Sequence, residues 1–147
     1  MQDVVSKLTF LEKEVDGLKS KEAIRDLVLR YCHLAVEADA DGLMALFADG
    51  GTFGLPSTMG MGTVSGEPLR RLIKESIGDK RPWPFIHNHL IRLEGPDRAS
   101  GIVHAEIRLG SRGYKLTHFY VYDDQYVMEA GVWRFKHRGV TSYDVAD

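Results

Sequence analysis

The stretch that decides the fold is YKLTHFYVYDDQYVMEAGVWRFKHRGVTS, residues 114–142. It holds two long runs rich in β-branched and aromatic residues, 114–128 and 131–142, separated by the turn sequence Glu129-Ala130-Gly131. Runs of this composition with a short link predict antiparallel neighbours, because parallel strands need a long crossover. Two similar runs, 85–94 and 99–109, come before them, so we predict a meander of four long strands.

The first half of the chain has helical periodicity instead. Apolar residues at positions 4, 8, 11, 15 and 18 form a heptad-like stripe, which either covers the chain's own sheet or pairs with a neighbouring subunit. Ser20 is the predicted cap of a second helix, whose apolar face lies within 24–35. A short helix is expected from Gly42 to Phe47, and another begins near Pro68. Segment 49–66 predicts two short strands around a mobile loop, in which Met59 and Met61 are candidate lid residues.

The bulk properties fit one ordinary globular domain. The chain has 147 residues, 44% hydrophobic and 27% charged, with a net charge of −2, so we expect no nucleic-acid partner. The start, MQDVVSKLTFLEKEVDG, lacks the apolar core of a signal peptide, and no run approaches the ~20 apolar residues of a membrane span. Cys32 is the single cysteine, so no intramolecular disulfide forms, and we expect a cytoplasmic protein.

Helices followed by a meander predict an α+β fold over residues 1–147. We expect a cone-shaped roll, in which N-terminal helices wrap a curved antiparallel sheet around an apolar pocket. Three segments carry a family resemblance: EAIRDLVLRYCHLAVEADADGLMALFADGG at 22–51, FIHNHLIRLEGPDRASG at 85–101, and YVYDDQYVMEAGVWRFKHRG at 120–139. The chain resembles the SnoaL-like branch of the nuclear transport factor 2-like superfamily, which includes scytalone dehydratase, bile acid dehydratase and a dehydrochlorinase. The resemblance implies a deep pocket for a small hydrophobic ring compound, no metal or cofactor, and self-association as a homodimer or homotrimer.

The dehydratases of this family use an Asp–His pair, in which the carboxylate orients an imidazole that removes a proton. The aspartate follows the family tyrosine by five residues, and the histidine precedes the family asparagine by four. Tyr31 matches the tyrosine and Asn88 the asparagine, but Val36 and Pro84 stand at the positions of the pair. The resemblance therefore implies the pocket more firmly than the reaction.

The candidate catalytic residues are Tyr31, as a hydrogen-bond donor to a substrate oxygen, and His87, as a general base. On a strand, His87 and His89 share one face and Asn88 takes the other, so either set faces the cavity. His104 and Glu106 share a face of the next strand, which leaves a metal as a lesser alternative. The remaining candidates for ligand binding are Asn88, His118, Tyr120, Phe53 and Trp83.

Three functions stay open. The first is a cofactor-independent lyase, such as a dehydratase, or an isomerase acting on a small cyclic substrate. The second is a binding or accessory module, which the missing Asp–His pair favours. The third is an assembly subunit like the small subunits of ring-hydroxylating dioxygenases, which the stripe from Val4 to Leu18 favours.

Overall fold

The computed structural model of the chain describes residues 2–55 and 62–146. Its elements are α1 (Gln2–Val36), α2 (Ala40–Ala45), β1 (Phe47–Gly54), β2 (Thr63–Ser65), α3 (Gly66–Ile77), β3 (Pro82–Leu93), β4 (Arg98–Leu109), β5 (Lys115–Glu129) and β6 (Val132–Asp144). A short 3-10 turn, Gly110–Arg112, links β4 to β5. The predicted succession of helices and then long strands is confirmed. The candidate lid residues Met59 and Met61 lie outside the described residues.

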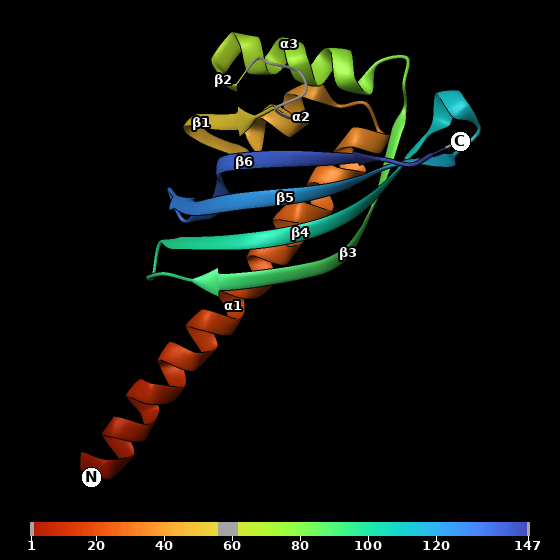
Figure 1. Cartoon of the computed structure of the whole chain (residues 1–147). Coiled ribbons are helices and arrows are strands. Elements are labelled where there is room, and N and C mark those ends of the chain that lie inside the picture. The colour runs from red at the N-terminus through yellow and green to blue at the C-terminus, as the bar shows by residue number, and fades with distance from the viewer. Residues whose placement is uncertain (1, 56–61, 147) are drawn as a thin grey trace.

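One continuous helix replaces the two that the sequence predicted at the N-terminus. α1 runs from Gln2 to Val36 without a break, so the prediction that Ser20 caps a second helix is wrong. Strong helix formers surround Ser20, and an interior glycine such as Gly17 costs only about 1 kcal/mol, which does not end a helix anchored on a sheet. A helix of 35 residues is about 52 Å long. Its first half extends well beyond the sheet, while its second half crosses it (Figure 1).

The short helix α2 also begins earlier than predicted. The Asp39 carboxylate accepts a hydrogen bond of 2.9 Å from the Gly42 backbone N–H, and this cap starts the helix at Ala40. The helix ends at Ala45, and Phe47 already belongs to β1. The predicted helix from Gly42 to Phe47 is therefore shifted by two residues.

The six strands form a single curved sheet in the order β2-β1-β6-β5-β4-β3. β3 to β6 pair as the predicted antiparallel meander, whereas β1 runs parallel to β6, so the sheet is mixed. The register slips between Ile86 and His89 on β3, and again between Gln125 and Tyr126 where β5 meets β6. Bulges of this kind bend strands and increase their twist, which is how an open sheet curls into a cone.

The core fills the concave side of this sheet. The second half of α1 and the apolar face of α3 pack over inward residues of the strands: Ile24, Val28, Leu69, Ile73, Val103, Ile107, Tyr122, Tyr126 and Phe135 are all buried. The expected α+β cone is thus confirmed. Among the described residues, no helix is both long enough and apolar enough to cross a membrane.

Candidate functional site

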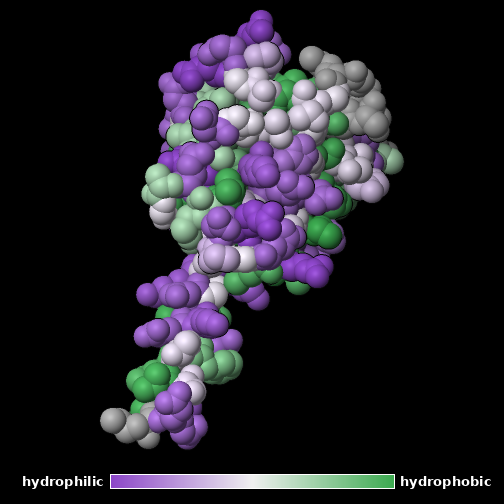
Figure 2. Space-filling model, turned by 90° about the vertical axis from the view of Figure 1, so that its left-hand side faces the viewer, coloured by the Kyte–Doolittle hydropathy of each residue, from purple (hydrophilic) through white to green (hydrophobic). Residues whose placement is uncertain are grey.

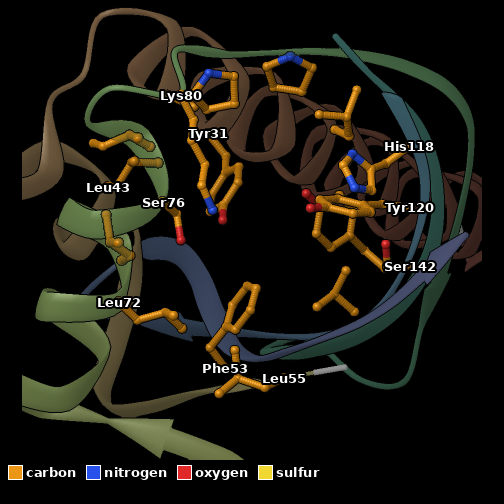
Figure 3. A pocket seen from close by; sticks show the side chains of 18 of the residues that line it. Tyr31, Leu43, Phe53, Leu55, Leu72, Ser76, Lys80, His118, Tyr120 and Ser142 are labelled. Carbon is orange, nitrogen blue, oxygen red and sulfur yellow. The ribbon is translucent and has the colours of Figure 1, made fainter. Parts of the chain in front are cut away.

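A cavity of about 400 Å³ lies inside the cone, between the helices and the concave face of the sheet (Figure 3). Most of its wall is apolar, and the residues come from all parts of the chain: Ala35, Phe53, Leu69, Leu72, Ile73, Pro84, Ile107 and Val140. Polar side chains gather where β5 begins and β6 ends, with His118, Tyr120, Ser142 and Asp144 all on the wall. Ser76 and Lys80 face them from the α3 side (Figure 3). The cavity is therefore apolar with one polar side.

Three tyrosines form a connected part of this wall. Tyr122 lies edge-on to Tyr31, with ring centroids 6.3 Å apart, and edge-on to Tyr120, at 5.8 Å. Burial raises the pKa of Tyr31 to about 12, and it also raises the pKa of Tyr122 and Tyr120. The three phenols are therefore neutral at physiological pH and can donate hydrogen bonds to a ligand oxygen. Tyr31, Tyr120 and Phe53 lie on the wall that the sequence predicted for them.

His118 on β5 is the histidine that reaches the cavity. The Thr117 hydroxyl donates its hydrogen to the Ile107 carbonyl, at 3.1 Å, so it accepts from His118 Nδ1, at 2.8 Å. With the Thr117 hydroxyl in this orientation, the hydrogen of neutral His118 lies on Nδ1 and the lone pair on Nε2. Nε2 lies 3.3 Å from the Asp144 carboxylate on β6, which pairs with the ring when it is protonated. His118 thus has the tautomer and the counter-ion of a proton acceptor.

His87 and Asn88, in contrast, lie on the outer face of the sheet. His87 Nε2 is 3.0 Å from Glu106 Oε2, and the Asn88 amide is 3.3 Å from His104 Nδ1. The sequence left open which of the two faces the pocket. The inward alternation of Pro82, Pro84 and Ile86 would turn Asn88 inward, but the bulge between Ile86 and His89 inserts one residue, so that His87 and Asn88 both project outward. Trp83 also lies outside, 39% exposed and edge-on to Tyr114.

The bulge turns His89 inward instead. His89 Nε2 lies 3.1 Å from the Tyr126 hydroxyl, which itself donates to Asp124 at 2.9 Å. His89 therefore donates to Tyr126, and burial, with smaller contributions from Arg138 and Arg25, lowers the pKa of His89 to about 4. A neutral histidine with this role is part of the packing between α1 and the sheet.

A fully buried ion pair under the tyrosines was missed by the sequence analysis. Arg138 Nε and Nη2 donate to the two oxygens of Asp124, at 3.0 and 3.2 Å, and neither side chain is exposed. Burial alone would lower the pKa of Arg138, but the Asp124 carboxylate and the nearby tyrosines raise it well above its usual range. The guanidinium carbon lies 3.7 Å from the centroid of Tyr122 and 4.4 Å from that of Tyr31. The pair thus supports the two rings that line the cavity.

Arg138 has one unused donor. Among the described residues, Nη1 is buried without a hydrogen-bond partner. Such a donor is costly in a dry interior. The positive charge of Arg138 is itself balanced by Asp124, so this unmet donor is the polar feature beneath Tyr31 and Tyr122.

Pro84 and Val36 stand at the two positions of the family's Asp–His pair. Pro84 lines the cavity from β3, and Val36 is half-buried near the end of α1. Neither side chain titrates, so the ionisable groups on the wall, besides the three tyrosines, are those of His118, Asp144 and Lys80. Across residues 2–55 and 62–146, no three His, Cys, Asp or Glu side chains come together as a metal site.

Comparison with known proteins places the chain in a family. The model of the SnoaL-like domain matches residues 16–139. No curated protein matches. Solved structures share the fold: a nuclear transport factor 2-like protein with a cystatin-like fold from Novosphingobium aromaticivorans superposes with a TM-score of 0.79 at 23% identity, over 95% of this chain and 92% of that one.

Two dehydrochlorinase structures are similar as well. LinA superposes with a TM-score of 0.77 at 21% identity, covering 91% of this chain and 93% of its own. The hexachlorocyclohexane dehydrochlorinase LinA-type3 from Novosphingobium barchaimii gives 0.74 at 21%, covering 90% and 92%. At these identities the likeness extends to the fold alone. The match of the family model over residues 16–139 shows that the chain belongs to the SnoaL-like domain family.

Proposed function

We propose that this chain binds a small, largely apolar ring compound inside the cone, with an oxygen of the ligand held at the polar side of the cavity. One observation carries the proposal: the apolar wall encloses the space, and His118, Tyr120 and Ser142 converge on one side of it (Figure 3). Ligand sites combine an apolar enclosure with a few oriented polar groups in this way. A volume of about 400 Å³ equals the share of about 13 liquid waters, enough for one or two fused rings.

A bulky side chain at Val140 is expected to abolish binding. Val140 is half-buried on β6 and lines the cavity, so Val140→Phe fills the space that the ligand needs. We expect the affinity for the two-ring ketone 1-tetralone to fall at least about 50-fold, which corresponds to roughly 2.3 kcal/mol of lost binding. Titration calorimetry or ligand-observed NMR measures it.

Val132→Phe is the matched control, since Val132 lies on the same strand but is 50% exposed and away from the cavity. It should bind 1-tetralone like the unaltered chain. Equal affinity for Val140→Phe and the unaltered chain would show that the ligand does not enter the cone.

We further propose that His118 makes the pocket catalytic, with proton removal beside a carbonyl as the elementary step. The observation that favours it is the hydrogen-bond order Ile107–Thr117–His118, which leaves Nε2 as the base next to Asp144. Nε2 takes the proton from the carbon, the C–H electron pair forms the enolate, and a phenol such as Tyr120 donates a hydrogen bond to the enolate oxygen. Return of a proton to a different carbon gives an isomerase, and loss of a leaving group gives a lyase.

Exchange of carbon-bound hydrogen in D₂O tests this step without knowledge of the natural substrate. The unaltered chain is expected to speed deuterium uptake at the carbon beside the carbonyl of 1-tetralone. His118→Gln should slow the enzymatic part by about 100-fold or more, since a positioned base contributes 10²–10⁴-fold. NMR follows both the exchange and the binding, which should change little.

His87→Gln provides the control, because His87 lies on the outer face and was the base that the sequence favoured. It should exchange hydrogen at the unaltered rate. If His118→Gln exchanges as fast as the unaltered chain while binding persists, His118 is not the base and the pocket only binds.

A further inference from the structure

The first half of α1 carries an apolar surface that no other described residue covers. Residues 2–20 are called the arm from here on. They extend past the sheet (Figure 1) except in their last turn, where Gly17 lies next to Leu93 of β3, and hydrophobic side chains alternate with hydrophilic ones along their surface (Figure 2). The stripe predicted from the sequence is exposed along its whole length: Val4 59%, Leu8 55%, Leu11 54%, Val15 46% and Leu18 67%. The expectation that it covers the chain's own sheet is wrong, which leaves the alternative of a neighbouring subunit.

The stripe is not the buried face of α1 continued into solvent. The residues of α1 that pack on the sheet, such as Ile24 and Val28, lie roughly 120° around the helix from the line that joins Leu11, Val15 and Leu18, at 100° per residue. Leu29 continues the line of the stripe and is itself 48% exposed. The sheet domain therefore lies to one side and does not block the stripe.

We propose that the arm binds the arm of a second copy of this chain as a parallel, in-register, two-stranded coiled coil. The spacings of four, three, four and three give the 3.5-residue repeat that such a seam requires. Leu8 and Val15 take the a positions, and Val4, Leu11 and Leu18 take the d positions. Val15 at a with Leu11 and Leu18 at d is the combination that favours two strands, whereas Leu8 at a and Val4 at d do not follow it. Short isolated helices are marginal in water, so an exposed arm of this length gains stability from such a partner.

The charges beside the seam specify the partner and its direction. Lys7 and Glu14 occupy g positions, and Glu12 and Lys19 occupy e positions. In a parallel pair each g residue meets the e residue five positions later on the other helix. Lys7 then faces Glu12 of the second copy, and Glu14 faces Lys19, so each of the four side chains meets an opposite charge.

An antiparallel pair satisfies these residues less well. With Leu8 opposite Leu11, Lys7 still meets Glu14, but Glu12 falls opposite Val5 and has no charged partner. Lys7 makes one ion pair within the arm, 3.3 Å to Asp3, and both side chains are largely exposed, so the amine is free to reorient toward a second helix. The parallel arrangement is therefore the one that gives all four flanking side chains an opposite charge.

Single cysteines test the direction of the pair. In a Cys32→Ala background, which removes the one native thiol, Val4→Cys is expected to form a disulfide-linked dimer readily under mild oxidation. Lys13→Cys, on the opposite side of the arm, should remain monomeric on a non-reducing gel. Linkage between Val4→Cys and Val15→Cys chains without linkage of either alone would overturn the parallel assignment. No linkage above the Lys13→Cys background in any of these experiments would overturn the pairing of arms.

Charge reversal tests the complementarity. Glu12→Lys/Glu14→Lys makes the four flanking residues positive, and Lys7→Glu/Lys19→Glu makes them negative. Each variant alone is expected to dissociate at least about tenfold more readily than the unaltered chain, and an equimolar mixture should restore association. Sedimentation equilibrium measures the masses, and circular dichroism checks that the sheet domain stays folded, as expected for substitutions remote from the core. Unchanged association of both variants, or a mass of three chains, would overturn the proposal.

Discussion

Replacing Arg138 with methionine is expected to lower the free energy of unfolding by about 3 to 5 kcal/mol. The substitution leaves the Asp124 carboxylate fully buried with only the Tyr126 hydroxyl as donor, and removal of one partner of a buried pair costs this much. It also removes the cation that lies against the rings of Tyr31 and Tyr122. Urea denaturation, followed by tryptophan fluorescence, measures the change.

The double variant Asp124→Leu/Arg138→Met distinguishes the loss of stability caused by an unpaired charge from the loss caused by altered packing. With both charges absent, no uncompensated group remains, so we expect this variant to unfold less readily than Arg138→Met alone. If the double variant is less stable than the single one, the methionine itself, and not the missing counter-ion, is what disrupts the core.

Truncation of Phe135 to alanine is the second change with a large expected effect, again about 3 to 5 kcal/mol. The side chain is fully buried, and its ring centroid lies 5.3 Å from that of Phe47 and 5.7 Å from that of Tyr31. The Arg138 guanidinium lies 4.6 Å from the same ring. The cavity left behind therefore undermines the aromatic cluster and the cation together, and we expect the midpoint of urea denaturation to fall accordingly.

Phe119→Ala is the matched control, because Phe119 is 45% exposed on the outer face of β5. It should cost less than about 1 kcal/mol, as expected for a substitution away from the core. If the two truncations destabilise the chain equally, the inner face of the sheet is not the part that holds the domain together.

The strands could be predicted from the sequence because their signal is local. The alternation of His118, Tyr120 and Tyr122 places these residues on one face, and the structure has them on the cavity wall. The same alternation continues to Asp124 and Tyr126, so the buried carboxylate was within reach of the pattern. The continuity of α1 through Ser20 could not be predicted in this way. It depends on the packing of the helix against the sheet, which a local capping signal does not contain.

The bulges could not be predicted from the sequence, and they decide which side chains of β3 and β6 face inward. Strict alternation from Trp133 and Phe135 would turn His137 inward, but the register slip on β6 turns Arg138 inward instead. On β3 the same kind of slip sends His87 and Asn88 outward and His89 inward. A bulge inserts one residue with no characteristic composition here, so the identity of the inward residues depends on the paired strand.

Pro84 has a consequence beyond the missing base of the family. β3 is the outermost strand of the sheet, and its free edge offers unpaired backbone groups to any strand that approaches. Pro82 and Pro84 carry no N–H, and the bulge after Ile86 interrupts the row again, so this edge is a poor template for β-aggregation. A Pro84→His substitution made to introduce the family's type of base would therefore also add a backbone donor at the exposed edge, at some loss of solubility.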